Sequence, residues 1–212
     1  MDAVAIRTEA VAESRVCFGE AELAPGPVDV RTAFGLGRPA DLDIGFGKGR
    51  SLAEWALARR DGMLLGIEKR KGFVGRALER LDAAARLRVR IVHGDARAVL
   101  PRLRPAGFFR SCAMSFPDPW WKRRHMKRQV VGTPLAEEIA RLLGPGGEMF
   151  LQTDVEERAA QFRSAFAGCG RFDDISGPGG FLPANPTGIR SNREIRYAET
   201  GVPVFRMLFR KR

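Results

Sequence analysis

The stretch ADLDIGFGKG, residues 40–49, runs from an apolar segment into a loop with three alternating glycines. Glycine lets the backbone turn tightly and approach a ligand closely. Residues 50–60, RSLAEWALARR, follow with the apolar spacing of an amphipathic helix. A buried strand, a glycine loop and a helix in this order predict the first unit of an α/β sheet.

The same alternation continues along the chain. Apolar runs predict further strands in residues 62–68, 88–96, 109–120, 147–154 and 202–212. Helical spacing predicts helices in residues 71–84, 133–147 and 155–170. Thr133 is placed to cap the second of these helices, and a Gly-Pro-Gly-Gly run in residues 144–147 is placed to stop it. Strands that alternate with helices imply parallel βαβ units and a doubly wound α/β sheet.

The chain has 212 residues, which suits one globular domain with a sizeable core. Residues 1–38 are loosely patterned and rich in Gly and Pro, so we expect an N-terminal arm there. The domain itself is expected in residues 39–212. Within it, residues 175–188 read as a loop by composition.

The amino-acid composition of the chain is strongly basic. There are 36 Lys and Arg residues against 25 Asp and Glu, which gives a formal net charge of +11. Such a surplus attracts polyanions, with nucleic acid as the first class and an anionic membrane surface as the second. A generally basic protein without a charged ligand explains the charge about equally well.

Other classes are disfavoured by the sequence. No apolar run approaches the roughly 20 residues of a membrane helix. Residues 1–15 lack the apolar stretch of a secretory signal. The three cysteines, Cys17, Cys112 and Cys169, fit neither a disulfide framework nor a zinc site. We expect a cytoplasmic protein without a membrane partner and without a metal.

Acidic residues stand at or near the ends of the predicted parallel strands: Asp43, Glu68, Asp95, Asp118 and Asp154. Ligands of doubly wound sheets bind beyond the carboxyl ends of the strands. Acids scattered over a surface would not fall one to a strand end, so this placement indicates a binding site.

The spacing of the glycines in the loop indicates which class of ligand the site binds. A dinucleotide fingerprint, G-x-G-x-x-G, would need glycine at position 50, where this chain has Arg50. The alternating form, with Gly45, Gly47 and Gly49, is common in methyltransferases that bind S-adenosylmethionine. Three nearby glycines also make plain turns, so the acids at the strand ends carry much of the argument.

Three carboxylates suit this methyl donor. Glu68 is placed to accept hydrogen bonds from both ribose hydroxyls, and Asp95 is placed to meet the exocyclic amine of adenine. Asp43 precedes the loop, where it can hold a water or the ammonium of the ligand. The expected cofactor site therefore joins these acids to the three glycines.

The segment FPDPWWKRRHMKR, residues 116–128, holds Asp118 between two prolines that restrict its backbone on both sides. A rigid carboxylate suggests preorganised electrostatics. Methyltransferases of exocyclic amines carry two adjacent prolines after the polar residue, whereas this chain has one on each side. Guanine N7 needs no base but gains positive charge on methylation, which Asp118 could stabilise. The plain alternative is a rigid turn with a buried tryptophan.

A basic run follows the two tryptophans, and its members are Lys122, Arg123, Arg124, Lys127 and Arg128. Such side chains neutralise phosphates, and indole rings can stack with bases. His125 lies among them and can contact phosphate. A solvated helix face is the alternative reading of the same charges.

Taken together, the motifs DIGFGKG, GIEKR, HGDA, FPDPWWKRRHMKR and LQTD resemble the bacterial tRNA (guanine-N7-)-methyltransferases, from about Asp41 to the C-terminus. The resemblance implies a Rossmann-like class I S-adenosylmethionine-dependent methyltransferase sheet, mostly parallel with a C-terminal antiparallel strand. It implies methylation of N7 of a guanine in the variable loop of tRNA.

The resemblance also implies roles for single residues. Asp43, Glu68, Asp95 and Asp118 correspond to the ligands of S-adenosylmethionine, and Asp118 is also the implied catalytic residue. Lys122 and Asp154 correspond to substrate contacts, and residues 124–129 to the RNA-binding segment. Ser191 and Glu194, in the sequence SNRE, are the nearest match to a Thr-x-x-Glu block that binds substrate in the family.

The chain departs from the family pattern at several positions. Asp43 stands where the family usually has glutamate, and Trp121 fills a position that is often Pro or His. Residues 181–200 are the least similar part. These departures bear on which guanine is chosen more than on the reaction.

Other functions stay open on the sequence alone. One is a methyltransferase of another RNA, or of a protein amine or a small molecule; the basic run disfavours the last two. Another is an RNA-binding domain without turnover, which the acids at the strand ends disfavour. A nicotinamide oxidoreductase is disfavoured by Arg50. A monomer and a homodimer are both compatible with the sequence.

Overall fold

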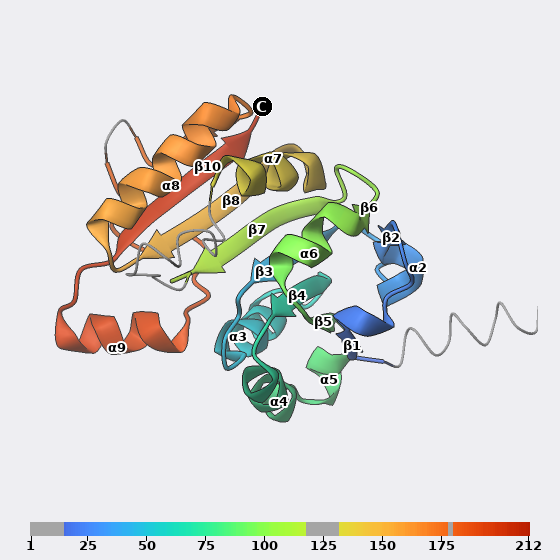
Figure 1. The fold of residues 1–212 in the computed structure, drawn as a ribbon. Helices are drawn as coiled ribbons and strands as arrows, with labels where there is room; N and C mark the ends of the chain where they lie inside the picture. The colour runs from blue at the N-terminus through green and yellow to red at the C-terminus, as the bar shows by residue number, and fades with distance from the viewer. Residues whose placement is uncertain (1–14, 118–131, 178–179) are drawn as a thin grey trace, which may run out of the picture.

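The computed structural model describes residues 15–117, 132–177 and 180–212. In this part of the chain an eight-stranded sheet has the order β1-β5-β4-β3-β7-β8-β10-β9 (Figure 1). Its strands are β1 (Cys17–Gly19), β3 (Ala40–Ile44), β4 (Leu64–Glu68), β5 (Val89–His93), β7 (Phe109–Ser115), β8 (Leu143–Thr153), β9 (Phe172–Asp174) and β10 (Phe205–Lys211). The pairs from β1 to β8 are parallel, and β10 is antiparallel to both β8 and β9. The predicted α/β class with a C-terminal antiparallel strand is confirmed.

Helices lie on both faces of the sheet (Figure 1). One core contains side chains of α2 (Val30–Phe34), α6 (Ala96–Val99), α7 (Thr133–Leu142) and α8 (Glu156–Cys169). The other core contains side chains of α3 (Arg50–Ala58), α4 (Lys71–Arg80) and α5 (Ala83–Arg86). A polar helix, α9 (Asn192–Thr200), precedes the last strand, and two short strands, β2 (Val28–Asp29) and β6 (Leu103–Arg104), pair separately. Short 3-10 turns occupy Glu20–Glu22 and Leu100–Arg102.

The predicted start of the helix in residues 133–147 is wrong in detail. Gly132 is the N-cap residue, Thr133 is already helical, and no side chain caps the helix. Pro134 stands in the first turn, where its missing N–H costs no hydrogen bond. The predicted stop is also displaced, because the helix ends at Leu142 and β8 starts at the next residue.

The Gly-Pro-Gly-Gly run belongs to this strand. Phe109 pairs with Leu143, and Ser111 then pairs with Glu148, so the run in residues 144–147 bulges out of the ladder between these two pairs. A glycine-rich bulge of this kind lets one strand carry extra residues while pairing resumes in register.

Residues 15–38, which the sequence places in the N-terminal arm, contact the domain closely. β1 pairs in parallel with β5, and the side chains of Val30, Phe34 and Leu36 are fully buried in the larger core. Residues 1–14 lie outside the described residues, and the boundary at residue 39 stays a prediction.

No helix within the described ranges is long and apolar enough to cross a membrane.

Candidate active site

The carboxyl ends of five parallel strands bring polar side chains to one edge of the sheet. In spatial order these are Asp95 after β5, Glu68 on β4, Asp43 on β3, Ser115 on β7 and Asp154 after β8. Two adjoining cavities open at this edge, with volumes of about 840 Å³ and about 380 Å³. Glu68 and Ser115 line both cavities, Asp95 lines the larger, and Asp43 lines the smaller. The sheet order therefore assembles most of the acids that the sequence singled out.

The glycine loop forms the floor between the cavities. Gly45 and Gly47 have φ values of 74° and 60°, which L side chains rarely adopt. A Cβ atom added at either position would meet no atom of residues 15–117, 132–177 or 180–212 within 4 Å, its chain neighbours aside, so among these residues the loop presents a bare backbone to the cleft. This is the surface that a ligand lying across the loop would need.

Gly49 has a different role from the one that the sequence suggests. Its φ is 77°, and an added Cβ atom would lie 2.3 Å from the Cβ atom of Ala77 on α4. Gly49 therefore allows α3 and α4 to pack closely, which its alternation with the other glycines does not reveal.

Glu68 ties the loop to the end of β4. Its Oε2 atom accepts a hydrogen bond of 3.0 Å from the Gly47 N–H, and its Oε1 atom accepts one of 2.9 Å from the Arg70 N–H. The side chain is buried at the cavity wall. Each carboxylate oxygen has a second lone pair, so Glu68 can hold the loop and still accept hydroxyl groups from a ribose.

Asp43 is buried beside the loop and accepts a hydrogen bond of 2.7 Å from Ser51 Oγ. Burial raises its pKa to about 6, with a further contribution from the nearby charge of Glu68, while the Ser51 hydrogen bond opposes the shift. A carboxylate that is costly to ionise gains from a cationic partner. The site is thus suited to the ammonium of an amino-acid tail.

Asp95 is the most strongly paired of the three acids. It caps α6 by accepting from the Arg97 N–H, and it accepts from the side chains of Arg97 and Lys69 at 2.6 and 2.8 Å. Arg97 first, and then Lys69, hold the pKa of Asp95 well below its usual range. Asp95 therefore remains a charged acceptor at the wall of the larger cavity, where an amine of adenine can bind.

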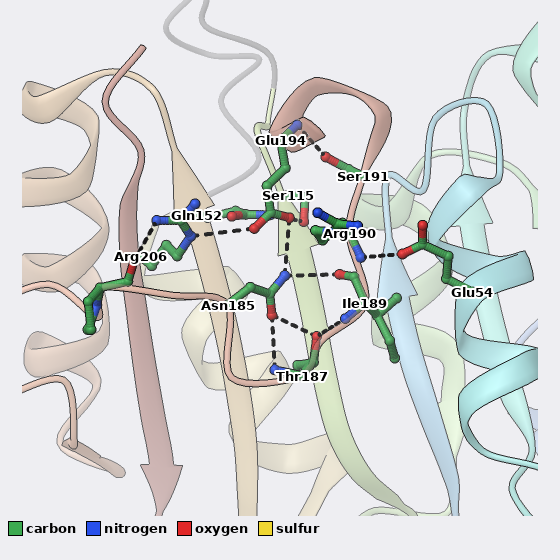
Figure 2. Close-up of polar contacts among 11 residues, drawn as sticks. Glu54, Ser115, Gln152, Asn185, Thr187, Ile189, Arg190, Ser191, Glu194 and Arg206 are labelled. Atoms are coloured by element: carbon green, nitrogen blue, oxygen red, sulfur yellow. Dashed lines mark hydrogen bonds and ion pairs between the residues drawn. The ribbon is translucent and has the colours of Figure 1, made fainter. Parts of the chain in front are cut away.

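Asp154 and Glu194 do not line either cavity in the described part of the chain. Asp154 accepts a hydrogen bond of 2.6 Å from the hydroxyl of Tyr197 and lies 3.9 Å from Arg193. Glu194 is 3 % exposed and accepts from Gln152 at 3.0 Å (Figure 2). For Glu194, which is buried, a direct contact with substrate would first require release from its partners, whereas the half-buried Asp154 keeps lone pairs for a further contact.

Ser191 both caps a helix and lines a cavity. Its Oγ atom caps α9 by accepting from the Glu194 N–H at 3.2 Å (Figure 2). It also lines the smaller cavity, together with Asn192, Arg193 and Arg196 of the same helix. The Ser-x-x-Glu pair therefore builds the start of a helix whose exposed end borders the cleft.

The predicted catalytic residue and the basic run, Asp118, Lys122, Arg124, His125, Lys127 and Arg128, lie outside the described residues. The structure describes the residues that lead to them, up to Pro117. Phe116 has a φ of 52°, uncommon for a bulky residue, and its N–H donates to the carbonyl of Gln152 at 2.8 Å. Strained backbone of this kind clusters at functional sites.

Helix α9 holds Phe116 in place. The ring of Tyr197 meets the ring of Phe116 edge to face at 5.6 Å, and the Arg193 guanidinium lies 5.5 Å from the centre of the same ring. The sequence did not indicate a role for Tyr197, Arg193 or Ser115. The available signal for Ser115 was a hydroxyl residue after the apolar run Cys112–Met114, three positions before Asp118.

Comparisons with known proteins identify the family and the fold of the chain. The family profile Methyltransf_4, described as "Putative methyltransferase", matches residues 37–207. A tRNA (guanine-N(7)-)-methyltransferase from Myxococcus xanthus is 34% identical over 85% of this chain and 87% of its own length. A protein of the same name from Anaeromyxobacter dehalogenans is 37% identical over 84% of this chain and 89% of its own length.

Solved structures share the fold. The 16S rRNA methyltransferase KamB matches 92% of this chain and 94% of its own, with a TM-score of 0.57 and 15% identity. An S-adenosylmethionine-dependent methyltransferase from Mesorhizobium loti matches 83% of this chain and 92% of its own, with a TM-score of 0.53 and 14% identity. The predicted Rossmann-like methyltransferase fold is confirmed. By the profile match and the identity to these relatives, the chain belongs to the Methyltransf_4 family, that of the tRNA (guanine-N(7)-)-methyltransferases.

Proposed function

We propose that this protein transfers a methyl group from S-adenosylmethionine to N7 of a guanine in the variable loop of tRNA. The observation that carries the proposal is the cavity edge formed by Glu68, Asp95 and the bare backbone of the glycine loop, in a chain of this family. The enzyme acts in the cytoplasm, where its substrate is modified.

The residues at the edge fit the cofactor one by one. Glu68 accepts from the ribose hydroxyls, Asp95 from the adenine amine, and Asp43 pairs with the ammonium of the amino-acid tail, while Gly45 and Gly47 leave room for the ligand. When bound there, S-adenosylmethionine supplies a methyl group activated by a positively charged sulfur.

The protein's part in the reaction is mostly positioning and electrostatics. Guanine N7 carries a free lone pair at neutral pH, so no base is required to activate it. Asp118, with a proline on each side, stabilises the positive charge that the base acquires or orients its N1–H and N2–H groups. Lys122, Arg124, His125, Lys127 and Arg128 bind the RNA backbone. Ser191 and the exposed end of α9 complete the RNA side of the cleft.

The test is to map the methylated nucleoside after incubation of unmodified tRNA with a labelled methyl donor. We expect 7-methylguanosine at a single position with the wild-type protein and a loss of most turnover in Asp118→Ala, because the fixed carboxylate would be gone. Asp61→Ala is the matched control, since Asp61 is exposed and stands at the opposite end of the strands, just before β4. Label in protein but not in tRNA would reject the substrate, and near-normal turnover of Asp118→Ala would reject its role.

A further inference from the structure

A polar chain of side chains crosses the sheet beside the candidate active site. Ser115 on β7 and Gln152 on β8 are register partners in the parallel pair. The Gln152 Nε2 atom donates to Ser115 Oγ at 3.0 Å and to Glu194 Oε2 at 3.0 Å (Figure 2). Beyond Glu194, the Arg206 guanidinium forms an ion pair of 3.4 Å with the same carboxylate.

The hydrogen bonds that link these side chains have a fixed donor and acceptor order. A carboxylate beside Arg206 is acceptor only, so the Gln152 amide must turn its NH₂ group toward Glu194. The opposite orientation would place the amide oxygen against the carboxylate. The amide then uses its second N–H on Ser115 Oγ. The Gln152 oxygen has no hydrogen-bond partner among the described residues, which agrees with an orientation imposed from the Glu194 side.

This orientation of the Gln152 amide determines what the hydroxyl of Ser115 can do. Its oxygen accepts from Gln152, so its single proton is available in another direction. Among residues 15–117, 132–177 and 180–212, none accepts that proton. Ser115 lines both cavities, so the hydroxyl can donate to a ligand bound there.

The position of Ser115 indicates which ligand it meets. Along the edge, Asp95, Glu68 and Asp43 occupy the ends of β5, β4 and β3, which under the proposed function hold the methyl donor. Ser115 is next in line on β7, on the side from which the methyl acceptor must approach. In guanine, the acceptor atom beside N7 on the same edge is O6.

We propose that Ser115 is a specificity-determining residue that donates a hydrogen bond to O6 of the guanine being methylated. Gln152 and Glu194 are positioning residues that keep the hydroxyl proton free for the base. This inference rests on the proposed function and adds to it the residue that recognises the base beside the reacting nitrogen.

The test combines a change in the enzyme with a change in one substrate atom. The substrates are tRNAs with guanosine or 6-thioguanosine at the methylated position, since sulfur is the weaker acceptor and N7 is retained. We expect Ser115→Ala to lower kcat/KM on guanosine by about tenfold, the usual effect of one hydrogen bond. When sulfur replaces O6, kcat/KM should fall by a larger factor for the wild-type enzyme than for Ser115→Ala. Any intrinsic effect of sulfur on N7 acts on both enzymes and cancels in this comparison.

Two further variants test the positioning residues. Gln152→Met and Glu194→Gln should each reduce the sensitivity to 6-thioguanosine and lower kcat, with the KM for the methyl donor unchanged and thermal unfolding as the check on the fold. Ser111→Ala is the matched control, because Ser111 lies at the start of the same strand and its hydroxyl donates to Asp41 at 2.9 Å. It should keep the full sensitivity to sulfur.

Several results would overturn the assignment. Equal losses on sulfur substitution in wild type and Ser115→Ala would show that the hydroxyl does not meet O6. A change only in the KM for the methyl donor would place Ser115 on the cofactor instead. If the wild-type protein methylates no tRNA guanine, the proposed function itself fails. If it methylates N7 and only the comparison with sulfur fails, the inference about Ser115 alone falls.

Discussion

At the scale of single residues, the site contains a carboxylate, that of Asp43, whose ionisation is costly in free energy because it is buried. Asp43 is buried, and its pKa rises to about 6 from a usual 3.8. Because the folded pKa is the higher one, the folded chain binds the proton more tightly, and the free energy of unfolding falls as pH rises between these values. At 1.36 kcal/mol per pKa unit, the ionised side chain costs about 3 kcal/mol above that window. We interpret this cost as one that a cationic ligand offsets.

The Asp43→Asn variant should therefore be more stable than wild type at pH 7.5, by about 1–3 kcal/mol, since the amide still accepts from Ser51 and carries no charge. Below about pH 3 the gain should vanish, because the wild-type carboxyl is then protonated in both states. Urea unfolding across pH measures this, with Asp61→Asn as the exposed control. A gain independent of pH would contradict the assignment of the shift to Asp43.

Two glycines of the loop provide a second test at this scale. Gly45→Ala should cost about 1–2 kcal/mol of unfolding free energy, the strain of a left-handed backbone with open space around it. Gly49→Ala should cost about 2–5 kcal/mol, because the added methyl group also collides with Ala77. Urea denaturation compares the pair directly. Equal losses would mean that α3 and α4 are not packed as closely as described.

At the scale of elements, α9 is held to the sheet mainly by polar contacts. Of its residues only Glu194 is buried, and the Glu194 carboxylate meets Gln152, Asn185 and Arg206. The segment before the helix is fixed as well, since the Arg190 N–H donates to Glu54 of α3 at 2.7 Å (Figure 2). The element that borders the smaller cavity thus depends on one buried acid.

Replacement of Glu194 by Ala should loosen this element selectively. It leaves Arg206 without its ion-pair partner, a change that costs about 3 kcal/mol or more when the pair is buried. Hydrogen–deuterium exchange should accelerate in residues 181–200 and stay slow in β3 and β4. Glu199→Ala, on the exposed side of the same helix, should leave exchange unchanged. Uniform acceleration over the whole sheet would argue against a local role.

The same elements show how far sequence reasoning reaches. The ends of β3, β4 and β5 could be predicted because apolar runs end in acids, and parallel strands bring those acids together. Helix α9 could not, since most of its residues are polar and its one buried side chain, that of Glu194, is charged. β1 and β9 have three residues each, too few for a pattern. The link from Ser115 to Glu194 depends on the register of β7 and β8 and on a return of the chain from far along the sequence.

At the scale of the whole molecule, the net charge of +11 attracts RNA, but the location of the charge decides how it binds. Changing Lys122, Arg124 and Lys127 together to Gln should weaken tRNA binding and flatten its salt dependence. The slope of log Kd against log salt should fall by roughly 2–3, at about 0.9 per lost phosphate contact.

A matched variant separates location from total charge. Arg38, Arg60 and Arg80 are exposed residues away from the cavity edge, and their change to Gln removes the same charge. Filter binding at several salt concentrations should show a nearly unchanged slope for this control. Equal effects of the two triple variants would assign the attraction to overall charge rather than to the basic run.

The strand β1 has a consequence for how the protein behaves in concentrated solution. Its three residues cover the backbone of β5 from Cys17 opposite Ile91 to Gly19 opposite His93. A shortened chain that begins at Leu23 would leave this row of donors and acceptors open, and an open row of this kind recruits strands from neighbouring molecules. Light scattering should therefore detect self-association in the shortened protein that the full chain does not show, and monodisperse behaviour would mean that β1 is dispensable as a cover.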